Sequence, residues 1–271
     1  MAELQTLAEG RPVAEVLARH LPAARAAAGS RKGVAVGVVG ALSVVALVAM
    51  GTLVFQPFGG DTTPLALFCS FTCVFLTAIA GISLFQRAKR QAVRLDLVED
   101  LLHALRWELH REGRLDLTLS ILPADHSTNR VREGRSMYGN VKFWCTDPWL
   151  ELRATLADGS RLRVRQVDKV KTKKGAWQRH VRVLKVHLRP SAAYTAPAAS
   201  ALAQQLRDRL HQRQATIFED PPEGLTGAVR PDGTLTVRVL QDDHDYRGAE
   251  VLAVVAELLA LLRPHRTPHV A

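Results

Sequence analysis

Two long uncharged runs dominate this chain of 271 residues. Residues 33–55 form the first run and residues 64–85 form the second. At about 1.5 Å of rise per residue, a helix over either run is about 33 Å long and matches a hydrocarbon core of about 30 Å. Lipid offers no hydrogen bonds to the backbone, so a helix that satisfies its own N–H and C=O groups is expected there. The sequence therefore predicts two transmembrane helices.

The segment between the two runs is short, polar and contains Gly59 and Gly60, so the helices should form an antiparallel hairpin over residues 33–85. Asp61 is its only charge, whereas five Lys and Arg residues precede the first run and four closely follow the second. Because positive charge collects on the cytoplasmic side, both termini are predicted to be cytoplasmic. We expect a multi-pass protein of a bacterial-type inner (plasma) membrane.

Small side chains recur on one side of each predicted transmembrane helix. Such stripes let helix backbones approach closely, either within the hairpin or between copies in a homo-oligomer, and the first alternative is favoured. Neither run carries an ionisable residue, which disfavours a proton relay or a charged transport path. The predicted helix-packing residues are Gly33, Gly37, Gly40, Cys69, Cys73, Thr77 and Gly81.

Two amphipathic segments flank the hairpin. Residues 1–32 should be a cytoplasmic N-terminal segment with a short helix that begins near Pro12 and lies along the inner leaflet, or else a loose tail. Residues 86–112 should form a membrane-proximal helix, because leucine and valine recur at three-four spacing from Leu95 to Leu109. Packing against the protein's own sheet is favoured over a coiled coil, since the seam covers only about two heptads.

Residues 113–271 have the pattern of a cytoplasmic α+β domain built on an antiparallel sheet. Alternating leucines after Arg114 are typical of a half-buried strand. The polar stretch 125–138 should be a loop, and Asp158-Gly159 is a strong hairpin signal. Further strands are expected over residues 140–146 and 149–157, separated by Asp147-Pro148, then from 161 to a turn at Gly175, and over 178–188.

The C-terminal third should add two helices and one hairpin. Leucines repeat every four residues within a predicted helix over 199–213. A short strand is expected over 216–219, and the turn 230–233 should lead into a strand over 234–240. The last helix, 249–262, is apolar nearly all round but too short to span a bilayer, so we expect it to be buried against the sheet.

The basic charge of the protein comes from one segment. The formal net charge is +10, from 36 Lys and Arg against 26 Asp and Glu; residues 161–189 hold 11 of these bases and one acid, which leaves 25 of each elsewhere. Such a local excess predicts an anion-binding or lipid-binding surface on the hairpin around Gly175. The predicted residues are Arg161, Arg163, Arg165, Lys169, Lys171, Lys173, Lys174, Trp177, Arg179, Arg182 and Lys185.

Several partners suit such a surface. Anionic lipid headgroups are favoured because the hairpin is tethered near a bilayer and each exposed base adds about 1 kcal/mol of attraction. A phosphorylated ligand such as a nucleotide is the next alternative, and nucleic acid stacking on Trp177 is less favoured. A further alternative is that the basic surface is simply solvated and has no dedicated ligand.

Enzymatic motifs are weak in this sequence. Consecutive side chains seldom converge on one ion, so Asp242, Asp243, His244 and Asp245 are only weak metal candidates. Cys145 has no nearby base, and His103 and His110 sit seven residues apart beside leucines of a core-like stripe. No cofactor is expected.

These features favour a non-enzymatic binding, sensing or scaffold module at the membrane. One alternative is a membrane-bound enzyme that uses the Asp/His loop. The other is an effector that oligomerises into a pore on sensing a ligand. The layout resembles bacterial effectors that join two transmembrane helices to a nucleotide-sensing β domain, a similarity of architecture that carries no function by itself.

Overall fold

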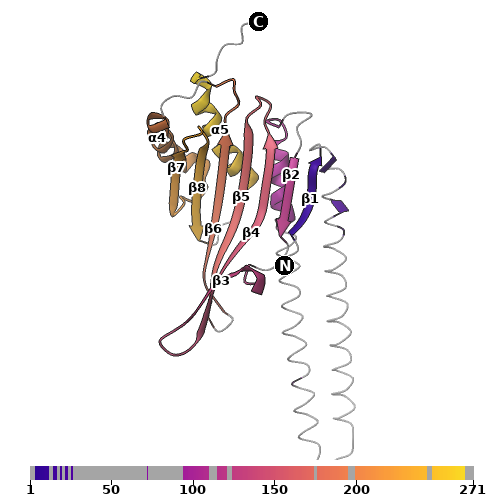
Figure 1. The fold of residues 1–271 in the computed structure, drawn as a ribbon, viewed down its shortest axis with the longest axis vertical. Helices are drawn as coiled ribbons and strands as arrows, with labels where there is room; N and C mark the ends of the chain where they lie inside the picture. The colour runs from indigo at the N-terminus through magenta and orange to yellow at the C-terminus, as the bar shows by residue number, and fades with distance from the viewer. Residues whose placement is uncertain are drawn as a thin grey trace, which may run out of the picture. The chain divides into compact units, whose positions relative to one another are not determined.

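The structure is a computed structural model. It describes residues 4–11, 94–109, 115–120, 124–173, 176–194, 199–242 and 246–265, with single residues at 72 and between 15 and 26; residues 4–11, 176, 177 and 199 are described by their backbone alone. The described elements form an α+β domain around an antiparallel sheet (Figure 1), as the sequence predicts for residues 113–271. They lie in a compact unit of residues 1–21 and 96–271.

The sheet contains eight strands in the order β1-β2-β4-β5-β6-β8-β7, with β3 paired to one end of β4. Every pairing is antiparallel, and seven of the strands lie between residues 115 and 242. The strands are β1 (Leu4–Arg11), β2 (Leu115–Ser120), β3 (Arg130–Arg135), β4 (Val141–Thr155), β5 (Arg161–Lys173), β6 (Ala176–Arg189), β7 (Gly224–Val229) and β8 (Leu235–Asp242).

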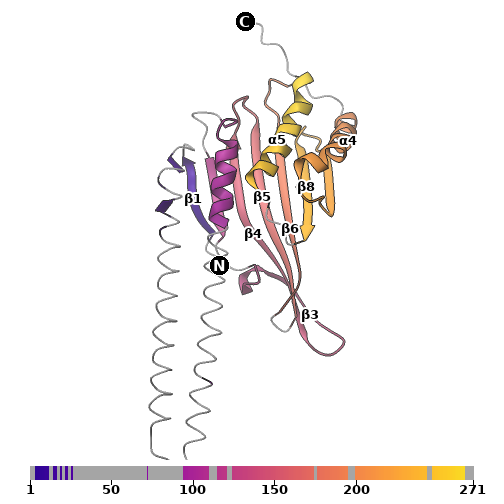
Figure 2. The same cartoon turned by 180° about the vertical axis from the view of Figure 1, so that it is seen from behind.

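Among the described elements, the helices all lie on one face of this sheet. Figure 2 shows the helix over residues 94–105, α4 (Ala199–Ile217) and α5 (Gly248–Leu262) on the same side of the strands. Two short 3-10 turns, η2 (Ser127–Asn129) and η3 (Arg263–His265), complete the described elements. We call the other face, which no described helix covers, the open face.

The core lies between the sheet and these helices. On the strand side, Leu152, Val164, Val186 and Val237 are cross-strand neighbours with no exposed surface. On the helix side, α5 contributes a run of equally buried valines and leucines, so this helix is buried against the sheet as predicted. Packing is tight at β7, where a Cβ on Gly227 would lie 2.8 Å from the Leu206 side chain of α4.

Within the segment 86–112 predicted to be one helix, residues 94–105 form a helix that packs on the protein's own sheet, as favoured, but the helix ends there and Leu109 pairs with Leu156 in a β-bridge. Val98, Leu102 and Leu105 are fully buried. Its contact with the start of α5 requires a glycine, since a Cβ on Gly248 would lie 2.6 Å from the backbone of Asp100. The leucine seam therefore packs within the domain and is not exposed for a coiled coil.

Two predicted turns are confirmed, and both depend on glycine. Gly159 between β4 and β5 has φ of +82°, and Gly233 before β8 has φ of +78°. Other side chains rarely adopt this left-handed conformation, so glycine marks these positions in the sequence. Asp158 and Asp232 complete the turns by accepting backbone hydrogen bonds two residues on. The β4-β5 and β7-β8 hairpins follow from this chemistry, while the turn predicted at Gly175 lies outside the described residues.

The predicted break at Asp147-Pro148 is wrong, because β4 runs through it as one strand of 15 residues. The pairing with β5 shifts between Asp147 and Leu150, which marks a bulge. Proline is tolerated there because a bulge leaves its position without a ladder hydrogen bond.

Two more local predictions are wrong. Part of the segment 125–138 expected to be a loop forms η2 and β3, and β3 pairs with the first residues of β4. The short strand expected at 216–219 is instead the end of α4, and Phe218 N–H still donates to the carbonyl of Gln214. Both Ile217 and Phe218 are buried, so packing on the sheet outweighs their β propensity.

The two predicted transmembrane runs, 33–55 and 64–85, lie outside the described residues apart from Thr72, as do all seven predicted helix-packing residues. Within the part of the chain that is described, no helix is both long enough and apolar enough to cross a bilayer.

Candidate anion-binding face of the sheet

In each of these strands, the residues adjacent to the core residues lie on the open face. Arg165 of β5 is the direct cross-strand partner of Lys185 of β6, and Lys185 is in turn the partner of Arg238 of β8. Because side chains alternate along a strand, they lie opposite the buried row of Val164, Val186 and Val237. Directly opposed Cβ atoms are about 5 Å apart, so three cations stand side by side. We call these three residues the cationic row.

The nearest acid on this face is already occupied. Glu151 of β4 is the cross-strand neighbour of Arg165 but forms ion pairs with Arg153 (2.5 Å) and Arg163 (2.9 Å). Burial alone would raise the pKa of Glu151, but hydrogen bonds from Arg163 and Arg153 outweigh it and lower that pKa. This carboxylate neutralises the neighbouring arginines rather than the cationic row.

No acidic side chain in the described ranges forms an ion pair with the cationic row. The Nε atom of Arg165 is buried and makes no hydrogen bond to a described group. A buried guanidinium nitrogen without an acceptor costs free energy that an anionic oxygen would recover.

Burial and neighbouring positive charge lower the pKa of two residues on this face. The pKa of Lys185 is lowered first by burial and then by the charges of Arg238 and Arg165. The pKa of His187, one step along β6, is also lowered by burial, then by Arg230 and Arg163. Burial disfavours a charge of either sign, but the smaller contribution from the neighbouring bases is a repulsion that an anion would relieve.

Neutral donors lie beside the cationic row. His187 and Thr236 are cross-strand partners, with 3.0 Å between Nδ1 and Oγ1. Together with the cationic row they offer guanidinium, ammonium, imidazole and hydroxyl groups on neighbouring strands. Such a mixture suits the several oxygens of a phosphate group.

Most of the predicted basic residues share this open face. The odd-numbered residues of β5 face it, from Arg161 to Lys173, and so do Arg179 and Lys185 of β6. Arg179 is neutralised by Glu223 and Asp242, each at 3.5 Å. Lys174 lies outside the described residues, and the side chain of Trp177 is not described.

Arg182 belongs to the opposite face. It is the direct partner of Asp168, and its Nε lies 3.4 Å from a carboxylate oxygen of that residue. His180 approaches the same oxygen at 3.6 Å, and Asp168 is 4% exposed. The only acid in the basic segment therefore holds Arg182 within the domain and removes it from the open face.

Sequence reasoning missed Arg238, Arg153 and His187. Arg238 lies about 50 residues beyond Lys185 in the chain, so only strand pairing brings the two side by side. The alternation in β8, with buried Leu235, Val237 and Val239 and polar residues between them, is the signal that could have placed it.

The other chemical candidates are less suited to a reaction. Cys145 is 2% exposed and packs in an apolar cluster, and burial raises the pKa of its thiol, with a further contribution from Asp125. Asp242 pairs with Arg179, while residues 243–245 and His110 lie outside the described residues. Among the residues that the structure covers, no group of three His, Cys, Asp or Glu side chains is placed to hold a metal ion.

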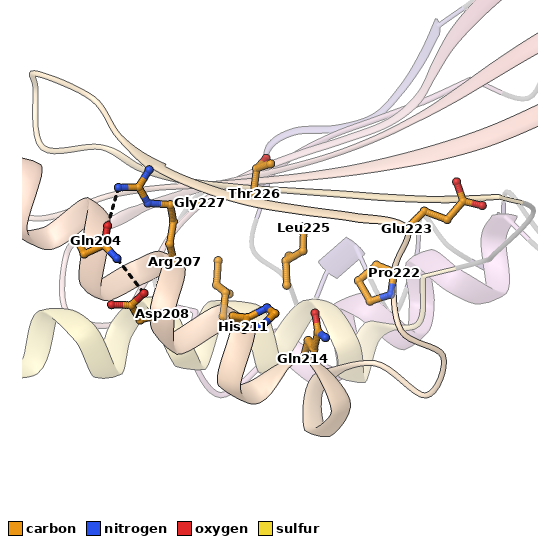
Figure 3. Close-up of a pocket in the computed structure, with 11 residues that line it drawn as sticks. Gln204, Arg207, Asp208, His211, Gln214, Pro222, Glu223, Leu225, Thr226 and Gly227 are labelled. Carbon is orange, nitrogen blue, oxygen red and sulfur yellow. Dashed lines mark hydrogen bonds between the residues drawn. The ribbon is translucent and has the colours of Figure 1, made fainter.

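A hollow of about 650 Å³ lies between α4 and β7 (Figure 3). Its α4 side is polar, and Arg207, Gln204 and Asp208 are joined by two hydrogen bonds of 2.9 Å. These bonds occupy the polar groups along the helix, and no predicted site residue lines the hollow. The cationic row therefore remains the stronger candidate.

Comparison with known proteins gives no family: no family model, curated protein or solved structure matches this chain.

Proposed function

We propose that this protein is a non-enzymatic binding module of the membrane whose open sheet face binds phosphate groups. The observation that carries the proposal is the cationic row, three adjacent bases without a described carboxylate partner. The phosphate group belongs either to an anionic lipid headgroup or to a soluble phosphorylated molecule. Both sources offer the same charged oxygens to the protein.

The geometry favours sharing one phosphate between strands. Arg165 and Arg238 flank Lys185, so a phosphate above Lys185 could accept hydrogen bonds from two guanidinium groups. Binding would also reduce the mutual repulsion of the cations, which contributes, after burial, to the lowered pKa of Lys185.

Membrane attachment comes from the two predicted transmembrane helices, and the lipid headgroup is the favoured source for that reason. The pore-forming alternative depends on the glycine stripe at residues 33–40 and the enzyme alternative on residues 242–245, so they remain sequence predictions.

The test uses the full-length protein in detergent micelles, examined by native mass spectrometry. One arm adds short-chain phosphatidic acid and the other adds ADP. In the test variant, Arg165→Gln, Lys185→Gln and Arg238→Gln remove the cationic row. The control variant, Arg106→Gln, Arg207→Gln and Arg263→Gln, removes the same charge from exposed positions elsewhere.

Each charge-assisted hydrogen bond contributes about 1.5–3 kcal/mol, so losing two or more should weaken binding about 100-fold. The control should change affinity by less than about three-fold, because distant surface charges are screened. A loss confined to phosphatidic acid or to ADP identifies the source. Equal binding by wild type and test variant, or no binding of either probe to wild type, would overturn the proposal.

A further inference from the structure

The hairpin of β3 and β4 extends as an arm from one end of the sheet (Figure 1). Its tip exposes two large hydrophobic side chains, Met137 at 93% and Tyr138 at 81%. Adjacent exposed residues of this kind are unusual on a soluble surface and mark a site of interaction. They belong to neither the cationic row nor the core.

The tip is held in a defined turn. Gly139 N–H donates to the carbonyl of Ser136 at 2.9 Å, and Ser136 N–H donates to the carbonyl of Asn140 at 2.8 Å. Gly139 has φ of +73°, which favours glycine at this position. An ordered turn loses little conformational freedom on binding, so Met137 and Tyr138 are presented ready for contact.

Cations stacked on aromatic rings stiffen the stalk of the arm. The Arg130 guanidinium lies 3.9 Å from the centre of the Phe143 ring, and Arg132 lies 5.1 Å from that of Trp144. Gly134 leaves room for the Trp144 ring, since a Cβ there would lie 3.1 Å from it. These contacts place Arg130 and Arg132 against the rings of the stalk.

The charge of the arm is strongly positive. Arg130, Arg132, Arg135 and Lys142 are opposed by Glu133 alone between residues 130 and 144. Lys173 of β5 is the cross-strand partner of Lys142 and adds to the same end of the sheet. Each base near an anionic bilayer increases its affinity about five-fold, and tyrosine favours the headgroup level.

We propose that this arm inserts its tip into the interface of an anionic bilayer. Met137 and Tyr138 enter among the headgroups, and the basic stalk contacts lipid phosphates. A nucleic acid is less suited, because the rings of Phe143 and Trp144 are covered by their own cations instead of being free to stack. This site is separate from the cationic row and does not depend on phosphate binding there.

The experiment places a fluorescent reporter at the tip of the full-length protein in lipid nanodiscs. Tyr138→Trp adds an indole to the arm, and Gln212→Trp adds one to an exposed position of α4 as a control. Difference spectra against wild type isolate each new indole. The discs contain phosphatidylcholine alone or with phosphatidylglycerol, and their acyl chains carry bromine as a quencher.

The expected result is strong quenching and a blue shift for Tyr138→Trp in the anionic discs, and neither for the control. Adding Arg132→Glu and Arg135→Glu to Tyr138→Trp should weaken quenching several-fold, because two attractions of about five-fold each become repulsions. Equal quenching of the tip and control reporters would overturn the proposal. Quenching by a single-stranded oligonucleotide but not by brominated lipid would also do so, and would identify a nucleic-acid partner.

The same reporter separates this site from the sheet face. Combining Tyr138→Trp with the three glutamine substitutions of the cationic row should leave lipid quenching unchanged. Loss of quenching in that combination would show that membrane contact by the arm depends on the cationic row, and would contradict an independent site.

Discussion

The two faces of one sheet differ in how they are completed. Val164, Val186 and Val237 are fully buried beneath helices, whereas their neighbours Arg165, Lys185 and Arg238 stand on the open side. One alternating pattern serves both purposes, because successive side chains of a strand point in opposite directions. The comparison teaches that residues next to each other in the chain can belong to separate tasks, folding and binding.

The two faces also treat charge differently. On the helix-covered side, the carboxylate of Asp168 lies close to the side chains of Arg182 and His180, so these charges have partners within the domain. On the open side the cationic row has no described acidic partner. Unopposed positive charge on this partly exposed face leaves interaction energy available for an anionic ligand.

The largest contrast is expected between adjacent residues of β6. Val186→Asn should destabilise the protein by about 3–5 kcal/mol, because it removes buried methyl groups and places an amide without partners in the core. Lys185→Asn should change stability by less than about 0.5 kcal/mol. Thermal unfolding of both variants in the same detergent measures the difference. Similar losses would mean that the open face is also part of the core.

A smaller contrast should separate two carboxylates. Asp168→Asn should cost about 3 kcal/mol, since it leaves Arg182 poorly paired in a largely buried position. Glu151→Gln on the open face should cost less than about 1 kcal/mol, as partly exposed ion pairs usually do. Chemical unfolding in one detergent compares them. A greater loss for Glu151→Gln would reverse our assignment of the two faces.

The smallest expected effect is the pH dependence of His187. Its folded-state pKa lies below the ordinary value of 6.5, first because of burial and then because of Arg230 and Arg163. As pH falls below 6.5, the unfolded chain therefore binds a proton that the folded protein resists, and stability decreases until the lower pKa is passed. His187→Gln should flatten this part of the stability profile.

Phosphate binding should change the pKa of His187 in the opposite direction, upward. An anion on the cationic row would raise the pKa of His187, which NMR titration of its imidazole signals can follow with and without ADP. An unchanged titration in the presence of bound ADP would place the ligand away from this face.

Local patterns predicted much of the domain. The glycine turns at Gly159 and Gly233 and the four-residue leucine repeat of α4 are set by neighbours in the chain, and all three are confirmed. The break expected at Asp147-Pro148 fails because a bulge lets proline remain in β4. That bulge is fixed by pairing with β5, a partner that local residue preferences do not reveal.

The candidate site was predictable only in part. The basic content of residues 161–189 pointed to an anion-binding surface, and Arg163, Arg165 and Lys185 are on the open face. The sequence analysis grouped Arg182 with them, yet alternation along β6 places Arg182 on the opposite face, beside Asp168. It also omitted Arg238, which joins the row only through pairing of β6 with β8.

By itself the sequence determined the composition of this protein: two uncharged runs, a locally basic segment, and alternating strands with glycine turns. These follow from local physics, namely hydrophobicity, charge and backbone freedom. Tertiary structure decided which bases meet and which acids neutralise them, because strand register and helix coverage join residues far apart in the chain. The cationic row and the arm are therefore properties of the fold.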